Sequence, residues 1–355
     1  MLVLVENIYA VWREKKTYSA IFMDITGAFN NVHHGRLIHN MKKRRIPPQL
    51  TRWIQSFLTG RSTQLKFNGT TSESFVTLAG VPQGSPLSPI LYIFYNADLL
   101  DIPHHEELGL GFIDDIGYGV KGATAAGNIG KLANMLEKAE TWRQKHGAQF
   151  EKSKYVLIHF TRNKGTNTDA SITIDGTTIH PADEAKYLGV IFDNDLKYRA
   201  HVDQIVKKGT KFALAIAGIA KSTWGAKFKH LRRLFTAVAA PRMDYAAIIW
   251  HRPGDNRTAP TQTQVRKLST VQRQIMRAIT GCFHTTPTSA LEAETGLPPP
   301  KPPPLGENPP VNHKNANRPT TTPNPQVGCP STERQSRVFL SVKPRKPRKA
   351  LPRVH

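Results

Sequence analysis

The apolar positions of residues 1–297 follow two spacings, one typical of strands and one typical of helices. Short, largely apolar runs bounded by turn residues predict strands, because a buried strand carries little polar sequence. We expect strands at 17–25, 155–160, 171–179 and 186–192, and two short strands within 109–120 around Asp114-Asp115. Residues 62–78 predict a hairpin that turns at Asn68-Gly69, since this dipeptide accepts the positive φ angles of a tight turn.

Apolar residues spaced three and four apart predict helices elsewhere. The clearest case is 49–58, where one side carries Leu50, Trp53, Ile54, Phe57 and Leu58. Residues 1–12 have a similar amphipathic pattern. We expect further helices at about 35–45, 86–100 and 128–146, and a mainly helical, basic segment at 199–281.

Residues 298–355 have a different composition. They hold 15 of the 26 prolines and few large apolar residues, so we expect a disordered tail. The stretch 343–353, KPRKPRKALPR, is a basic cluster typical of binding to nucleic acid or to an import receptor. The simpler interpretation is a solvated tail without a role.

The charge balance points to a polyanionic partner. The net charge is +23, from 49 Lys and Arg against 26 Asp and Glu, which favours nucleic acid and leaves an anionic membrane surface as the alternative. No apolar run approaches the roughly 20 residues of a spanning helix, so we expect no membrane insertion. The N-terminal stretch lacks a basic leader, so we expect no secretion. Two cysteines, Cys282 and Cys329, exclude a disulfide framework and a cysteine-based zinc module.

Three aspartates stand at strand ends. Asp114 and Asp115 form a turn between two apolar runs, and Asp24 ends another run. Each alone is as well explained as a turn or capping residue. If the strands are neighbours, the three carboxylates converge and repel one another unless a cation lies between them. Oxygen ligands of this kind suit Mg²⁺.

A loop rich in glycine and proline lies between these aspartates. Residues 80–89, GVPQGSPLSP, hold two Gly, three Pro and two Ser and lead into a helix. Gly80 and Gly84 allow close approach of the backbone to a ligand, and the N–H groups at a helix start can bind an anion.

Four strings then resemble one family. MDITGAFNNV (23–32), GVPQGSPLSP (80–89), GFIDDI (111–116) and AKYLGVIFD (185–193) resemble the reverse transcriptases of LINE-type, jockey-like non-LTR retrotransposons, in order and in spacing. The resemblance covers about residues 1–297. The segment 231–253 resembles the fungal elements of this group.

The resemblance implies a catalytic role for four residues. Asp24, Asp114 and Asp115 would be the catalytic carboxylates and metal ligands, with the carbonyl of Ile25 as a further ligand. Lys154 would donate a proton to pyrophosphate, although Lys152 is equally basic and two residues away.

The resemblance also implies binding roles. Phe29 would be the steric gate that excludes a 2′-hydroxyl, although ordinary core packing also explains it. Gln83 would contact the incoming nucleotide, and the loop that holds Gly84 and Ser85 would line that pocket. Tyr187, Leu188 and Gly189 would belong to the hairpin that grips the primer. The basic helices after 199 would follow duplex phosphates without reading bases.

The implied fold is α+β, with a right-hand polymerase palm, an antiparallel sheet packed by helices, followed by a helical thumb. We expect palm with a remnant of fingers at 1–198, thumb or connection at 199–297 and the disordered tail at 298–355. The implied reaction is RNA-directed DNA polymerisation with two Mg²⁺ ions, or Mn²⁺ in their place. The implied partners are an RNA template, a DNA primer or target and dNTPs.

The chain departs from the family pattern in several places. Asn30 replaces a frequent Asp, and Ile113 replaces a more usual Ala or Val. Asp24 comes so early that we expect most of the fingers to be missing. We also expect neither endonuclease nor RNase H functions in this chain. The composition break after Pro300 suggests a frame shift or a mis-spliced gene model.

Two alternatives stay open. One is a truncated, catalytically inactive remnant that binds nucleic acid. The other is a basic membrane-surface or RNA-packaging protein in which the aspartates only form turns. A nucleus or a cytoplasmic ribonucleoprotein is the expected location, with the mitochondrion as a further option.

Overall fold

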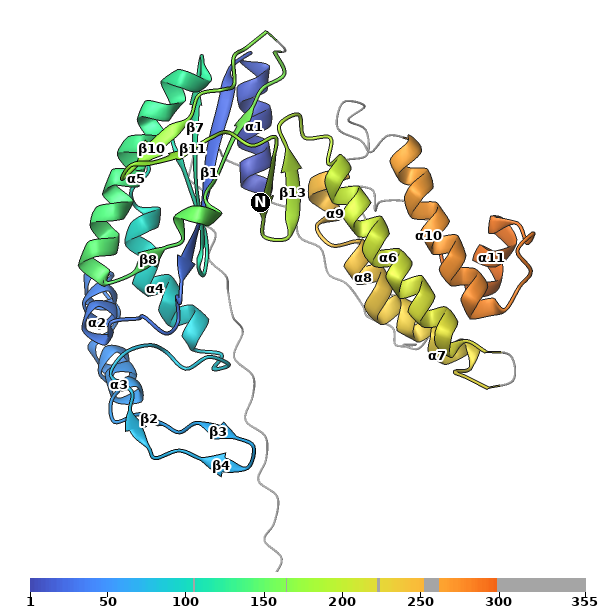
Figure 1. Ribbon diagram of the computed structural model, residues 1–355, viewed down its shortest axis with the longest axis horizontal. Coiled ribbons are helices and arrows are strands. Elements are labelled where there is room, and N and C mark those ends of the chain that lie inside the picture. The colour runs from blue at the N-terminus through green and yellow to red at the C-terminus, as the bar shows by residue number, and fades with distance from the viewer. Residues whose placement is uncertain (105, 164, 222–223, 252–261, 299–355) are drawn as a thin grey trace, which may run out of the picture. The chain divides into compact units, whose positions relative to one another are not determined.

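The structure is a computed structural model that describes residues 1–104, 106–163, 165–221, 224–251 and 262–298 (Figure 1). Met1–Glu307 is one compact unit, and a second unit, Asn308–His355, lies outside the described residues. Apart from Pro298, the predicted tail and its basic cluster also lie outside them. The compact unit combines helices with antiparallel strands, which confirms the α+β prediction.

A five-stranded antiparallel sheet forms the centre of this unit, and β1 (Thr17–Thr26) is its middle strand. β7 (Asp115–Gly122) pairs with one edge of β1, and β9 (Val156–Phe160) pairs with the other. β6 (Leu108–Phe112) extends the sheet beyond β7, and β8 (Gln149–Phe150) pairs with the last two residues of β1. β1 is mostly apolar because both of its faces are covered.

Alternate residues of β1 enter two different cores, as the two-residue period of a strand requires. Ile21, Met23 and Ile25 enter a core formed with α2 (His34–Lys43), α3 (Pro48–Leu58), α4 (Ser88–Leu100) and α5 (Ala125–His146). Tyr18, Ala20 and Phe22 enter the other core, with α1 (Leu2–Arg13) and the helices after residue 198. Figure 1 shows α1 and α5 on opposite sides of β1.

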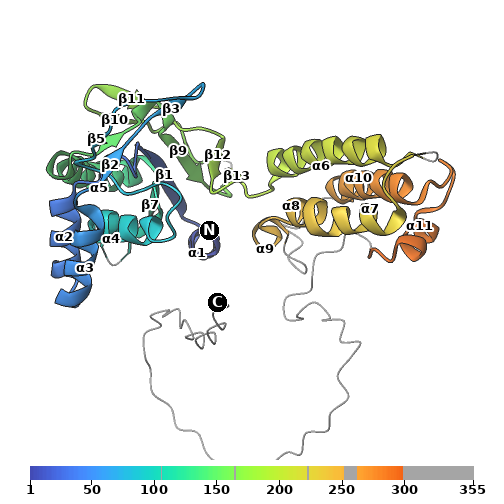
Figure 2. The ribbon, with the colours of Figure 1, turned by 90° about the horizontal axis from the view of Figure 1, so that it is seen from below.

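The segment after residue 198 is helical, as predicted. α6 (Arg199–Ile219) and α10 (Gln262–Thr280) lie side by side in both views (Figures 1 and 2). The shorter helices are α7 (Phe228–Leu234), α8 (Ala240–Met243), α9 (Ala247–Trp250) and α11 (Thr288–Thr295). A π-helical turn, Phe235–Ala239, joins α7 to α8 just before Pro241, whose missing N–H cannot continue an α-helical ladder. None of the helices in the described residues is both long and apolar enough to cross a membrane.

Two predicted helix starts are displaced. α4 begins at Ser88 rather than Pro86, because Ser85 and its neighbours form a turn in which Ser85 O accepts the N–H of Ser88. α5 begins at Ala125 rather than 128, because the hydroxyl of Thr124 caps it by accepting from the N–H of Gly127 at 3.1 Å.

Residues 171–179 form a hairpin, so the prediction of one strand was wrong. β10 (Ile172–Ile174) and β11 (Thr177–Ile179) pair across a turn in which Asp175 and Gly176 have φ angles of 45° and 76°. Asp-Gly is a hairpin signal that the apolar pattern obscured. Residues 186–192 likewise fold back, as β12 (Glu184–Tyr187) and β13 (Val190–Asp193).

The predicted hairpin at 62–78 is confirmed, with Asn68-Gly69 at its tip. It is held by two short pairs, β2 (Ser62–Thr63) with β5 (Phe75–Val76) and β3 (Lys66–Phe67) with β4 (Thr70–Thr71). All four strands are exposed, so little packing extends the pairing between them.

Candidate functional site

Two of the three predicted carboxylates lie opposite one another on neighbouring strands. Asp24, near the end of β1, is the register partner of Asp115, the first residue of β7. Opposed residues of an antiparallel pair project from the same face of a sheet. That face also carries Phe22, whose ring stacks on Tyr187 of β12 with 4.7 Å between the ring centroids. The primer-grip hairpin and the two carboxylates therefore share one face.

Asp114 lies in the tight turn between β6 and β7. Phe112 and Asp115 are register partners at the base of this turn, so Ile113 and Asp114 are its two central residues. All three aspartates are half-buried. The turn thus places Asp114 immediately beside the opposed pair.

The electrostatics of Asp115 reflect this grouping. Burial raises the pKa of its carboxyl, and the nearby carboxylates of Asp114 and Asp24 raise the pKa further. The ammonium of Lys186 acts in the opposite direction. A carboxylate with a raised pKa beside two others has the electrostatics of a cation-binding position.

Lys154 directly contacts this group. It ends a 3₁₀ turn, Lys152–Lys154, and its Nζ donates to Oδ2 of Asp24 at 2.6 Å. The contact raises the pKa of Lys154 and keeps it charged. Lys152 instead pairs with Asp175, at 2.6 Å. The two lysines, which the sequence left equivalent, thus have different partners.

The donor types in this group fit Mg²⁺. The ligands that the sequence predicts would be carboxylate oxygens and the carbonyl of Ile25, a residue in register with Phe150 at the end of β1. Within the described ranges, however, no three His, Cys, Asp or Glu side chains are close enough together to hold a metal ion. In this arrangement, one oxygen of Asp24 accepts the hydrogen bond from Lys154.

The loop after β5 is held against the loop after β1. Gly80 N–H donates to the carbonyl of Val32, and Val81 N–H donates to that of Phe29, both at 2.8 Å. Gly80 has φ +87°, and a Cβ there would lie 2.8 Å from the carbonyl oxygen of Asn30. Only glycine allows this close approach.

The predicted nucleotide-contacting residues lie further along this loop. The amide of Gln83 is exposed and donates to Oδ1 of Asn30 at 3.2 Å. Gly84 is exposed and has φ +88° with open space around its Cα. Ser85 Oγ accepts the N–H of Leu87 at 3.3 Å and so shapes the turn before α4. These side chains leave the loop open to solvent and to a ligand.

Phe29, the predicted steric gate, is half-buried and packs edge-on against Tyr92 of α4, with 5.6 Å between the ring centroids. Tyr92 is almost wholly buried, and its hydroxyl has no hydrogen-bond partner among the described residues. Burial raises the pKa of Tyr92, as do Tyr95 and the carboxylates of Asp114 and Asp24. Sequence reasoning missed Tyr92, since it looks like an ordinary core residue of an apolar helix.

The predicted primer-grip residues form the turn between β12 and β13. Leu188 and Gly189 have φ angles of 47° and 82°. The carbonyl of Leu188 accepts a hydrogen bond from the hydroxyl of Tyr245 at 2.9 Å, and the ring of Tyr245 lies against Gly189. Tyr245, which the sequence did not single out, therefore supports the tip of this hairpin.

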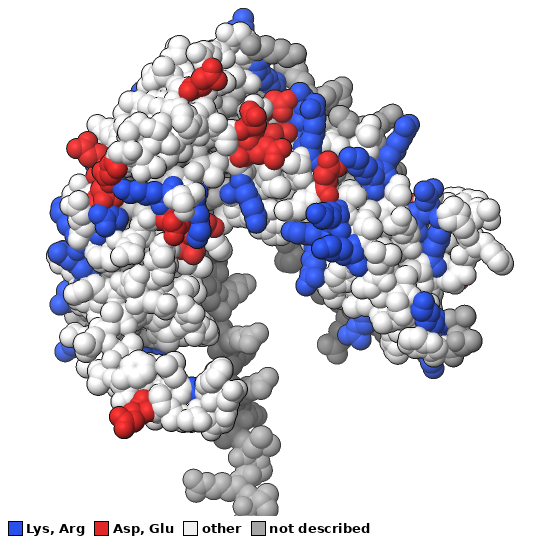
Figure 3. Space-filling model, viewed as in Figure 1, with Lys and Arg blue, Asp and Glu red and all other residues white. Residues whose placement is uncertain are grey.

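Lys and Arg side chains gather on the helical segment, where Figure 3 shows few Asp or Glu. Eight basic residues of this segment, whose helices were predicted to follow duplex phosphates, are exposed: Lys207, Lys208, Lys211, Lys221, Lys227, Lys229, Arg232 and Arg233. Arg232 differs from the others, because its Nε donates to the carbonyl of Thr295 at 2.6 Å, at the end of α11. It thus has a structural role.

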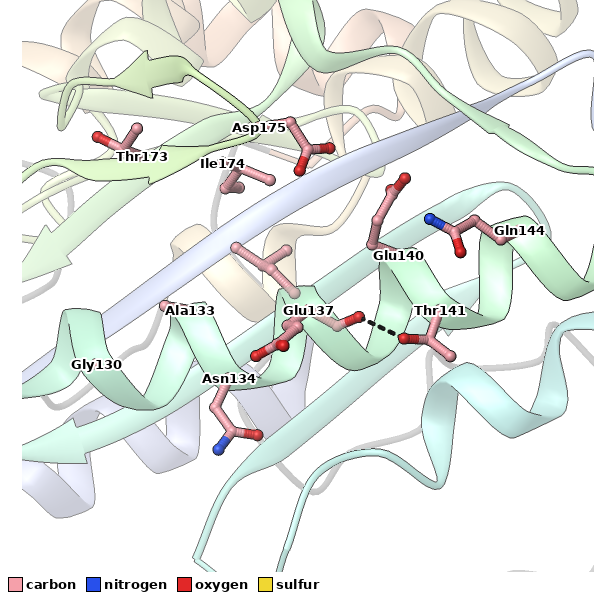
Figure 4. Close-up of a pocket in the computed structure, with 11 residues that line it drawn as sticks. Gly130, Ala133, Asn134, Glu137, Glu140, Thr141, Gln144, Thr173, Ile174 and Asp175 are labelled. Carbon is pink, nitrogen blue, oxygen red and sulfur yellow. Dashed lines mark hydrogen bonds between the residues drawn. The ribbon is translucent and has the colours of Figure 1, made fainter.

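A pocket of about 630 Å³ lies between α5 and β10, away from these residues (Figure 4). Its carboxylates are Glu137, Glu140 and Asp175. Two of them already have cationic partners, Arg143 for Glu140 and Lys152 for Asp175. None of the predicted site residues lines this pocket, so it is separate from the candidate site.

The family model described as reverse transcriptase (RNA-dependent DNA polymerase) matches residues 3–192. The RNA-directed DNA polymerase from mobile element jockey of Drosophila funebris is 28% identical over 80% of this chain and 31% of that protein. The probable RNA-directed DNA polymerase from transposon X-element of Drosophila melanogaster is 25% identical over 79% of this chain and 30% of that protein. The solved structure of apo telomerase from Candida tropicalis is similar at 11% identity, over 82% of this chain and 47% of that chain, with a TM-score of 0.43.

The chain spans about a third of the length of these curated relatives. They are Drosophila elements, so the fungal placement of the segment 231–253 stays a prediction, as do the domain boundaries at 198 and 297. The family model, in contrast, spans more than half of the chain and includes all three aspartates, the loop at 80–89 and the hairpin at 184–192. On this match, the chain belongs to the reverse transcriptase (RNA-dependent DNA polymerase) family.

Proposed function

We propose that this chain acts as the RNA-directed DNA polymerase of a non-LTR retrotransposon, adding dNTPs to the 3′-hydroxyl of a primer on an RNA template. One observation carries the proposal, the register pairing of Asp24 with Asp115 beside the turn that holds Asp114. The carboxylates of Asp114 and Asp24 act on that of Asp115, and such repulsion costs stability unless a cation or a cationic side chain offsets it. Such an arrangement is retained where a function needs it.

Asp24, Asp114 and Asp115 would hold Mg²⁺, or Mn²⁺ in its place, with the carbonyl of Ile25 as a further ligand. Bound there, a divalent cation supplies charge stabilisation for the reacting phosphate and its leaving group. Oδ2 of Asp24 accepts a hydrogen bond from the ammonium of Lys154. This oxygen would have to lose that bond in order to hold a cation.

Lys154 would protonate the leaving pyrophosphate. Its Nζ reaches the carboxylate group, is largely exposed and carries a proton whose pKa Asp24 raises. Because its Nζ lies at the carboxylate of Asp24, this ammonium would be the proton donor on hand for a phosphate bound beside the aspartates. Lys152 is held by Asp175, which favours Lys154 for this role.

Phe29 and the loop at 80–89 would form the nucleotide pocket. The ring of Phe29 is fixed by Tyr92 and by the backbone bond of Phe29 to Val81, so it can act as a rigid wall against a 2′-hydroxyl. Gln83 lies beside Asn30 at the open edge of the same loop. This arrangement supports selection of dNTPs by shape.

The hairpin at Tyr187, Leu188 and Gly189 would hold the primer, and the basic helices would follow the duplex. The hairpin shares the sheet face with Asp24 and Asp115, and the stacking of Tyr187 on Phe22 links the two. Exposed Lys and Arg on α6 and α7 offer contacts to phosphates without base readout.

Primer extension on an RNA template with Mg²⁺ tests the proposal. We expect the chain to incorporate dNTPs and Asp114→Ala to lose incorporation. Asp175→Ala is a matched control, because Asp175 also lies in a tight hairpin turn but away from the site, and it should retain incorporation. Duplex binding by all three proteins, without incorporation by any, would favour the non-catalytic remnant.

A further inference from the structure

The turn that carries Asp114 has an unusual backbone conformation. Ile113 has φ +60°. It is the one β-branched residue with a positive φ in the part of the chain that the structure describes. β-branched residues seldom adopt this conformation, because Cβ and its branches crowd the backbone carbonyl groups. Something must therefore hold Ile113 in place.

One side chain contacts this turn directly. The amide Nδ2 of Asn96 donates to the carbonyl oxygen of Ile113 at 2.5 Å. Asn96 lies on α4 and is 2% exposed, so water does not compete for the bond. The carbonyl that it holds belongs to the peptide group joining Ile113 to Asp114, and its direction sets where the Asp114 side chain begins.

α4 is a firm base for this contact. The hydroxyl of Tyr95 donates to the carbonyl of His146 at 2.6 Å, and the amide of Asn40 donates to the carbonyl of Tyr95 at 3.0 Å. Strand β6 also packs closely on the helix, because a Cβ at Gly111 would lie 2.8 Å from the side chain of Leu100. The distance between helix and turn is thus set by packing on both sides of Asn96.

We propose that Asn96 is a positioning residue, which holds the Ile113–Asp114 turn in its left-handed form and so directs the Asp114 carboxylate toward Asp24 and Asp115. The inference rests on the proposed role of Asp114 as a cation ligand. Without the bond, the Ile113–Asp114 peptide group is free to rotate, the strained turn relaxes, and the Asp114 carboxylate is no longer directed toward Asp24 and Asp115.

A second buried asparagine provides a matched control. Asn128 is wholly buried, and its amide donates to the carbonyl of Thr17 and to the hydroxyl of Ser19. These contacts lie at the opposite end of β1 from Asp24. Loss of Asn128 should cost stability without moving the carboxylates.

Two measurements on the full chain test the proposal. Calorimetry or electron paramagnetic resonance measures the affinity for Mn²⁺, and thermal melting measures stability. We expect Asn96→Ala to weaken Mn²⁺ binding about tenfold or more, as loss of an outer-shell partner does in metal sites. Asn128→Ala should lower the melting temperature similarly and leave Mn²⁺ affinity unchanged. If Asn96→Ala does not melt cooperatively, Asn96→Leu, which keeps the side-chain volume, replaces it.

Ile113→Gly tests whether Asn96 acts by holding the strained turn or only by stabilising the fold, because glycine adopts φ +60° without strain. In this background, Asn96→Ala should change Mn²⁺ affinity far less than in the parent. An unchanged affinity in Asn96→Ala, or an equal loss in both backgrounds, would overturn the proposal. Asp114→Asn must itself weaken Mn²⁺ binding; if it does not, the proposed function fails rather than the role of Asn96 alone.

Discussion

Lys152 and Lys154 show how far the direction of a single side chain separates two similar residues. They lie in the same 3₁₀ turn, yet Lys154 bonds Asp24 and Lys152 bonds Asp175. The ion pairs are exposed, so they contribute little to folding. The two ion pairs matter because they place the ammonium groups differently: that of Lys154 lies at Asp24, and that of Lys152 lies at Asp175.

Lys154→Met should lower the rate of single-nucleotide incorporation at saturating dNTP by about 100-fold, the usual scale for loss of a general acid. Lys152→Met should change the rate little, because its partner Asp175 lies outside the carboxylate group. Rapid-quench kinetics of both variants check this expectation. Equal losses in the two variants would show that the positive charge of this turn matters and the position of Lys154 does not.

The raised pKa of Asp115 has a consequence for stability. Its ordinary pKa is 3.8, and burial, Asp114 and Asp24 raise it in the folded protein. Between the two pKa values the folded state binds more protons than the unfolded state, so stability falls as pH rises through this window. The loss is complete above the folded pKa.

Asp115→Asn should therefore raise the melting temperature at pH 7 in EDTA, and the difference from the parent should shrink as pH falls toward 4. A gain of about 1 kcal/mol would raise the melting temperature by roughly 2–4 °C. Asp175→Asn is the control and should give no increase, since Lys152 lowers the pKa of Asp175. A lower melting temperature for Asp115→Asn at pH 7 would contradict this account.

Among the structural elements, the loop at 80–89 depends most on its place beside another segment. Its glycines were predicted to allow close approach, and Gly80 does approach the carbonyl of Asn30 closely. Gly84 has nearly the same φ but open space around it. A substitution at Gly84 therefore tests backbone strain alone, whereas one at Gly80 tests backbone strain together with a steric clash.

Gly84→Ala should lower stability by about 1–2 kcal/mol, the cost of a left-handed non-glycine residue. Gly80→Ala should cost more, because its Cβ also meets the carbonyl of Asn30 and disturbs the bonds to Val32 and Phe29. Chemical denaturation of both variants measures the difference. Equal costs would mean that the loop moves aside freely and that its packing on the segment after β1 is weak.

The hairpin β10–β11 shows a limit of the element predictions. The run 171–179 alternates well enough for one strand, and only the turn chemistry of Asp175-Gly176 distinguishes it from a hairpin. Long, strongly patterned elements such as α3 and β1 were predicted within a residue or two. The predicted starts of α5 and α4 were wrong by two or three residues, because a cap at Thr124 and a turn at Ser85 determine where these helices begin.

For the molecule as a whole, a large part of the basic excess lies on the helical segment, which we propose holds a nucleic-acid duplex. The helical segment carries exposed lysines on α6, and of its acidic residues Asp203 pairs with Lys267 at 2.6 Å. Non-specific binding of this kind depends on phosphate contacts and releases counterions. The affinity should fall steeply as salt rises.

Replacing Lys207, Lys208 and Lys211 together by Gln should weaken binding to an RNA–DNA duplex and reduce the salt dependence of log Kd. The slope should fall by about 0.9 for each phosphate that the variant no longer neutralises. Fluorescence anisotropy over a range of salt concentrations measures both. Arg232→Gln should act mainly on the melting temperature instead, because Arg232 bonds the carbonyl of Thr295. An unchanged slope in the triple variant would place the duplex elsewhere.

The order and chemistry of the site residues could be read from the sequence. Asp24, Asp114 and Asp115 stand at strand ends, and the loop at 80–89 lies between them, because periodicity and turn preference act over a few residues. These local rules predicted the strands and most helices, whereas the antiparallel palm and the roles of the site residues came from the resemblance to reverse transcriptases. They could not say how closely the three carboxylates would meet.

Contacts between distant segments required the folded chain. The register of Asp24 with Asp115, the choice of Lys154 over Lys152, and the partners Tyr92, Asn96 and Tyr245 all depend on packing between elements far apart in sequence. Each of these residues is locally ordinary: a lysine in a turn, a tyrosine or asparagine on a helix. Their roles come from the strands and helices that burial forces against them, and no short window of sequence contains that information.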